Sequence, residues 1–108
     1  MLKNLVIAPN IREKLTTKHK VKEGEIHECF FNIEGPYLLD ESEDHQSDPP
    51  TEWFLAYTDR GRLLKVVFVY RDGNIFLKSA FDANERAIHI YNPLRNHKEK
   101  QNGNSSKK

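Results

Sequence analysis

Several features are scarce in this sequence of 108 residues, and each scarcity excludes a class of protein. Cys29 is the single cysteine, so a scaffold held together by intramolecular disulfides is excluded. No apolar run approaches the roughly 18 residues that a membrane-spanning helix requires. The short apolar run Leu5–Ala8 near the start is also too short for the core of a signal peptide. We therefore expect a cytoplasmic protein without a membrane segment.

Lysine and arginine are missing from a long central stretch, although the net charge of the chain is only +1. Residues 23–59 contain eleven acidic residues and no basic ones, which leaves seventeen basic and five acidic residues elsewhere. Blocks of like charge usually form solvated surface. They can also polarise a molecule, so that a basic face meets a polyanion and an acidic segment keeps apart from it. Both interpretations stay open at this point.

Helix signals lie towards both ends of the chain. Asn10 stands three residues before Glu13, and Asp82 stands three residues before Glu85, which is the spacing of a capping box. The stretch between 22 and 32 repeats its apolar residues at the i, i+3, i+4 spacing of an amphipathic helix. The predicted helices cover residues 11–18, 22–32 and 83–92.

The centre of the chain shows the alternation and the β-branched residues of strands. The pair Asp72-Gly73 predicts a tight hairpin turn, which needs positive φ angles, so we expect antiparallel pairing. An acidic segment over 41–50 ends in two prolines and is expected to be an exposed loop. The predicted strands cover residues 37–40, 51–58, 62–71 and 75–81.

Together these elements predict one α+β domain over residues 1–94. It has N-terminal helices, an antiparallel sheet of three or four strands and a C-terminal helix. Such a sheet can be covered by helices on one face and stay open to a ligand on the other. Residues 95–108 are rich in Asn, Lys, Gly and Ser, and we expect them to form a basic disordered tail.

Short motifs in this order are shared with a known family. They are, along the chain, Lys18-His19 with Val21, Cys29-Phe30, Gly61–Leu64 with Val66–Phe68, Ile75 with Ser79-Ala80, and Glu85 with Tyr91. In these pieces, which span about residues 11–92, the chain resembles the BrnT-type toxins of bacterial type II toxin–antitoxin systems. The resemblance implies a RelE-like fold.

A closer similarity is to short bacterial proteins with an Asp-Pro-Pro-Thr segment, here Asp48–Thr51, followed by Trp53-Phe54 and a strand over 63–68. Such proteins often carry the label ADP-ribosyl-dinitrogen-reductase hydrolase. ADP-ribosylhydrolases are much larger helical proteins, so the strand-rich centre favours the toxin family. In one respect the chain departs from BrnT toxins, which typically have arginine where Phe76 and Phe81 stand here.

The resemblance implies an endoribonuclease that blocks translation, needs neither metal nor cofactor, and is neutralised by an antitoxin protein. We expect RNA and the antitoxin as partners. The chain is expected to form either a hetero-complex or a homo-oligomer. Cleavage needs a group that takes the 2′-proton of RNA and cations near the phosphate. The alternative is a non-catalytic RNA- or protein-binding module of the same fold. Candidate catalytic residues are Arg62, Lys65 and Lys78, and candidate RNA-binding residues are Arg71, Tyr91 and His19.

Each of these residues also has a structural interpretation. Lys65 and Lys78 stand inside apolar strands, where a lysine either reaches water along the sheet or pairs with an acid. The position of Arg62 is typical of a solvated residue in a turn. The position of His19 is typical of a helix end, where a cation complements the helix dipole. Tyr91 fits a core residue with a bonded hydroxyl.

Strand alternation predicts which side chains accompany the two lysines. We expect Lys65 to share a face with Val67, and Lys78 to share a face with Phe76 and Ala80. His45 lies among acidic residues without a recognised spacing of metal ligands, so no metal site is predicted.

Overall fold

The computed structural model describes residues 2–41 and 48–95. Most of the predicted acidic loop, His45 and nearly all of the predicted basic tail lie outside the described residues, so those expectations remain predictions. The described helices and strands confirm the α+β class. In chain order the elements are β1 (Leu5–Val6), α1 (Pro9–Lys14), the π-helical turn η1 (Leu15–His19), α2 (Glu23–Phe31), β2 (Leu38–Leu39), β3 (Thr51–Tyr57), β4 (Leu63–Arg71), β5 (Asn74–Asp82), α3 (Glu85–Tyr91) and η2 (Asn92–Leu94).

The sheet has five strands in the order β1-β5-β4-β3-β2. Strands β2 to β5 pair antiparallel, as predicted, and the Asp72-Gly73 turn joins β4 to β5 with positive φ angles of 53° and 81°. Strand β1 was not predicted. It pairs parallel to β5 through Leu5 and Val6, and two residues are too few to show an alternating pattern.

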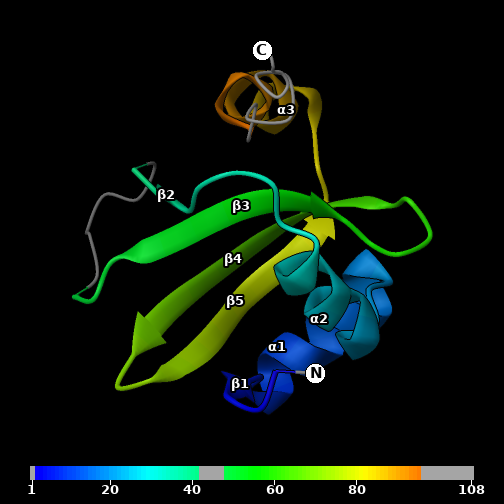
Figure 1. The fold of residues 1–108 in the computed structure, drawn as a ribbon. Helices are drawn as coiled ribbons and strands as arrows, with labels where there is room; N and C mark the ends of the chain where they lie inside the picture. Colours follow the sequence, from blue (N-terminus) through cyan, green and yellow to red (C-terminus); the bar gives the residue numbers. More distant parts are fainter. Residues whose placement is uncertain (1, 42–47, 96–108) are drawn as a thin grey trace.

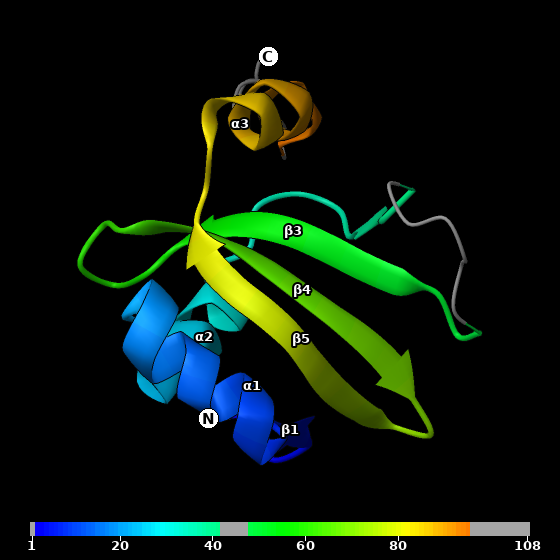
Figure 2. The ribbon, with the colours of Figure 1, turned by 180° about the vertical axis from the view of Figure 1, so that it is seen from behind.

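The two faces of the sheet are covered differently. Helices α1 and α2 lie together on one face, and α3 lies on the other, near the end of β5 (Figures 1 and 2). We call the first the helix face and the second the α3 face. On the helix face the Phe30 ring of α2 packs 4.9 Å from Phe54 and 5.5 Å from Phe68, measured between ring centroids. Burial of these rings, each worth about 1.5–3 kcal/mol, holds α2 against the sheet.

Two helices begin at residues other than those that the sequence predicts. Helix α1 begins at Pro9, because the fixed φ of proline suits the first helical position, and Asn10 is not a cap. Helix α3 begins after Asn84, whose side chain accepts a hydrogen bond from the Ala87 backbone N–H at 2.8 Å. Asp82 is instead the last residue of β5. Both predicted capping boxes are therefore wrong.

Strand β5 contains one residue more than β4 opposite it. The pairing register shifts next to Lys78, which has no partner in β4. As a result Phe76 pairs with Val69 on the α3 face, whereas Ala80 pairs with Val66 on the helix face. The prediction that Lys78 shares a face with both is wrong, because a β-bulge reverses the alternation at that point.

Helix α3 is fixed to the sheet by Tyr91. Its ring is fully buried, lies 5.9 Å from the Trp53 ring, and its hydroxyl donates to the Pro36 carbonyl at 2.7 Å. Gly35 lets this ring approach the backbone, since a Cβ added at Gly35 would lie 2.7 Å from the Tyr91 hydroxyl oxygen.

We therefore predict that Gly35→Ala destabilises the fold by about 1–3 kcal/mol, because the added methyl overpacks the Tyr91 contact. The matched control is Gly24→Ala in α2, where a Cβ would meet nothing within 4 Å. Alanine favours a helix over glycine by up to about 1 kcal/mol, so the control is expected to stabilise. Urea unfolding measures both, and equal midpoints for the two variants would contradict the packing role of Gly35.

Candidate functional site

Arg62 is the most heavily hydrogen-bonded side chain near the end of β5. Its Nε and Nη2 donate to the two carboxylate oxygens of Asp82 at 2.7 and 3.2 Å. Its Nη1 donates to the Lys20 carbonyl at 2.7 Å and to Glu25 at 3.2 Å, and Nη2 also donates to the His19 carbonyl at 3.0 Å. We call this set of contacts the Arg62 clasp.

The clasp accounts for every N–H of a guanidinium, which has five donors. The carbonyls of His19 and Lys20 belong to the end of η1, where helical carbonyls lack partners within the helix, and Lys20 itself adopts a left-handed φ of 56°. Arg62 satisfies these carbonyls and ties η1 to α2 and β5. No donor remains for a phosphate, contrary to the catalytic role that the resemblance implied for Arg62.

A line of aromatic and cationic side chains runs from the α3 face of the sheet to the end of η1. The Lys65 ammonium lies 4.5 Å from the centroid of the Trp53 ring and 6.0 Å from that of Phe81. Phe81 also contacts the His19 ring, with 5.3 Å between the ring centroids. We call these four residues the site strip. Among the residues that the structure describes, no carboxylate forms an ion pair with Lys65.

His19 ends η1, as its predicted place at a helix end required. Burial, followed by the charges of Lys18 and Lys14, lowers the pKa of His19 below its ordinary value of 6.5, and Asp82 opposes this only in part. The imidazole is therefore mostly neutral near pH 7, and one ring nitrogen can accept a proton.

The other predicted site residues do not join the strip. Tyr91 is fully buried, so its ring has no free face for an RNA base, and the predicted RNA contact is wrong for this position. The same burial raises the pKa of Tyr91 to about 12. Lys78 is exposed at the bulge of β5. Arg71 is exposed at the hairpin end, with its guanidinium 5.6 Å from the Phe76 ring. The structure thus brings together Lys65 and His19 but leaves Lys78 and Arg71 apart from them.

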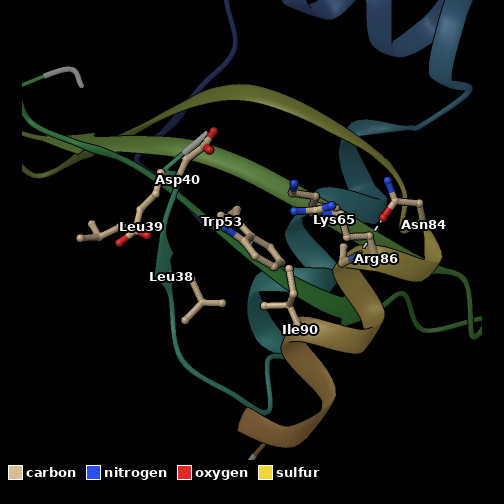
Figure 3. Close-up of a pocket in the computed structure, with 10 residues that line it drawn as sticks. Leu38, Leu39, Asp40, Trp53, Lys65, Asn84, Arg86 and Ile90 are labelled. Carbon is tan, nitrogen blue, oxygen red and sulfur yellow. Dashed lines mark hydrogen bonds between the residues drawn. The ribbon is translucent and has the colours of Figure 1, made fainter. Parts of the chain in front are cut away.

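A cavity of about 530 Å³ opens beside the strip, between α3 and the strands β2 and β3. Figure 3 shows side chains from all three elements around it, with Lys65 and Arg86 at the end near Asn84. We call it the α3 cavity. Nothing in the sequence singles out Arg86, because an exposed arginine on a helix is common and only the packing of α3 turns it to the cavity.

Cys29 does not provide a nucleophile. Its thiol is fully buried in α2 with Sγ 3.5 Å from the Ala56 carbonyl oxygen. Burial, together with the nearby charges of Glu25 and Glu28, raises the pKa of Cys29 to about 12. The thiol therefore stays protonated near neutral pH.

Comparisons of the chain with protein-family models, with curated proteins and with solved structures found no match. Within residues 2–41 and 48–95, three or more His, Cys, Asp or Glu side chains do not gather anywhere as a metal site would require. Over the same residues, every helix is too short or too polar to cross a membrane. Function is therefore inferred from the fold, the site strip and the α3 cavity.

We predict that Arg62→Lys destabilises the fold by about 2–3 kcal/mol, since one ammonium cannot reach two carbonyls and two carboxylates together. The matched control is Arg60→Lys, an exposed residue of the same turn, for which the change is expected to be within about 0.5 kcal/mol. Urea unfolding at pH 7 measures both. A loss no larger than that of the control would show that the clasp is dispensable.

The clasp also predicts a pH dependence of stability. The hydrogen bond from Arg62 is the main cause that lowers the pKa of Asp82. A carboxylate with a lowered pKa stabilises the fold above the ordinary aspartate value of about 4, and this stability is lost as the pH falls through the lowered pKa. Asp82→Asn is therefore expected to cost most at neutral pH and progressively less in acid. In an Arg62→Lys background the pH dependence of that cost should shrink, and an unchanged dependence would argue against the pair.

Proposed function

We propose that this chain is the toxin component of a type II toxin–antitoxin system, a metal-independent endoribonuclease that acts in the cytoplasm and is neutralised by an antitoxin protein. The observation that best supports the proposal is that Phe81 lies close to both His19 and Lys65. An aromatic ring beside a neutral imidazole and an ammonium offers RNA a stacking surface, a base and a phosphate-binding cation in one place.

The proposed reaction uses the 2′-hydroxyl of RNA as its own nucleophile. The neutral His19 ring takes the 2′-proton, and the 2′-oxygen attacks the neighbouring phosphorus. The bond from phosphorus to the 5′-oxygen then breaks, leaving a 2′,3′-cyclic phosphate, and the departing oxygen takes a proton from solvent. Lys65 stabilises the negative charge that develops on the phosphate oxygens. Phe81 stacks a base next to the scissile bond.

Charges at both ends of the site strip extend the proposed RNA path. Lys14 and Lys18 are close enough to His19 to lower its pKa, and Arg86 lines the cavity beside Lys65. A row of cations attracts a polyanion and binds the phosphates of a single strand, with an affinity that falls as salt is added. The RNA strand would accordingly run between α3 and η1 across Phe81.

The second candidate is a non-catalytic RNA- or protein-binding module of the same fold. Two observations favour it. Phe76 and Phe81 stand where BrnT toxins typically have arginine, and all donors of Arg62 are used within the clasp. Such a module would bind RNA along the same strip without breaking it.

The two candidates differ in the effect of His19→Ala. For a nuclease, loss of the general base is expected to lower RNA cleavage about 10²–10⁴-fold while RNA binding changes little. Lys65→Ala should weaken both. The measurements are growth and total RNA after induced expression, and cleavage and binding of a single-stranded RNA by purified protein in EDTA. The matched control is His89→Ala, an exposed histidine of α3, which should behave as wild type.

The pH profile gives a second readout. Because the pKa of His19 is lowered, the base form persists below pH 6.5, and cleavage should fall only at more acidic pH. RNA that is bound but left intact by the folded wild-type protein would establish the second candidate. If the protein neither binds nor cuts RNA, both candidate functions are wrong.

A further inference from the structure

Apart from Lys65, the side chains that line the α3 cavity take no part in the proposed cleavage step. Lys65 and Arg86 supply two positive charges, and Asp40 and Glu41 supply carboxylates from the segment that follows β2. Leu38 and Ile90 stand between, one from β2 and one from α3 (Figure 3). The cavity is thus cationic towards the site strip, apolar in the middle and acidic at the far end.

This polarity restricts the ligand that fits. A volume of about 530 Å³ is within the roughly 300–1,000 Å³ of small-molecule sites and accommodates one nucleotide. Two cations at one end suit a phosphate. The apolar walls suit a flat ring, which would lie between Leu38 and Ile90, because the Lys65 ammonium already covers the Trp53 ring.

The acidic end selects among the bases. An ionised carboxylate only accepts hydrogen bonds, and its two oxygens bind two adjacent donors at once. The guanine edge offers such a pair, N1–H and the N2 amino group, whereas adenine, cytosine and uracil each offer a single donor group there. Glu41 is exposed at the cavity and presents this kind of acceptor.

We propose that the α3 cavity is a base-selective subsite that takes a guanosine nucleotide, with its phosphate at Lys65 and Arg86 and its base edge at Glu41. The subsite rests on the proposed function in so far as the natural ligand is an RNA strand. Lys65 belongs to both the cavity and the site strip, so the guanosine in the cavity is the nucleotide next to the scissile phosphate.

Trp53 is the single tryptophan of the chain and lines the cavity, so its fluorescence reports occupancy directly. The experiment titrates the full-length protein with guanosine 3′-monophosphate, with the adenosine, cytidine and uridine 3′-monophosphates, and with inorganic phosphate. Guanosine 3′-monophosphate is expected to bind about tenfold or more tightly than the others, as one extra charge-assisted hydrogen bond implies. Inorganic phosphate should bind most weakly.

Two variants test the two ends of the cavity separately. Arg86→Gln, on the exposed side of α3, should weaken all four nucleotides by about tenfold while keeping the order among them. Glu41→Gln should remove the preference for guanosine and leave the affinity for the other three nucleotides near the wild-type value. Arg60→Gln, an exposed arginine in the turn after β3, is the control and should change nothing.

The outcomes separate this inference from the proposed function. Equal affinity for all four nucleotides, or nucleotide binding no tighter than that of inorganic phosphate, overturns the guanosine subsite even if RNA is cleaved. Guanosine-selective binding that is lost in Glu41→Gln supports the subsite even if the protein cleaves no RNA, in which case the nuclease proposal alone fails.

Discussion

The Arg62 guanidinium is the interaction on which the site depends, although no donor of this residue is left for a ligand. It joins three segments that are distant in sequence, namely the end of η1, the first turn of α2 and the end of β5. Two of its acceptors adjoin the site directly. It holds the carbonyl of His19 itself, and it holds Asp82, the residue after Phe81. The contact between the His19 and Phe81 rings is therefore held by a residue outside the site strip.

The unequal covering of the sheet explains where a ligand can approach. Helices α1 and α2 cover part of the helix face, where the rings of Phe30, Phe54 and Phe68 pack against one another. Farther along this face a hollow of about 250 Å³ stays open beside Tyr37, Phe68 and Tyr70. On the other face α3 covers only the end of the sheet near the last residues of β5. The border of α3 is consequently the place where Lys65 keeps its stem against the sheet while its charge stays accessible.

The sequence predicts those parts of the fold that depend only on residues close together in the chain. The Asp72-Gly73 turn, the strands beside it and the stripe of α2 follow from backbone preference and hydrophobic spacing. Strand β1 and the bulge at Lys78 depend on a partner strand, and a single sequence does not show which partner it is. The capping residue of α3 is a further case, because the spacing predicts Asp82 and the structure has Asn84 in that position.

The sequence indicates several of the residues that form the candidate site, but it says much less about how they are arranged in space. Lys65 and His19 were singled out from the sequence, but their common neighbour Phe81 was read only as a missing arginine. Arg62 draws attention in the sequence only through the resemblance, whereas its contacts in the structure are with acceptors that lie far away in the chain. Arg86 carries no sequence signal, because its place at the cavity results from the packing of α3.

The π-helical turn η1 imposes a constraint on how this segment can change in length. A π-helical turn closes i→i+5 hydrogen bonds, so a residue removed between 15 and 18 would change where η1 ends relative to α1. The His19 ring would then turn away from Phe81, and the carbonyls of His19 and Lys20 would leave the guanidinium that they share. This part of the chain can therefore accept many substitutions of its exposed side chains, whereas insertions and deletions are incompatible with the site.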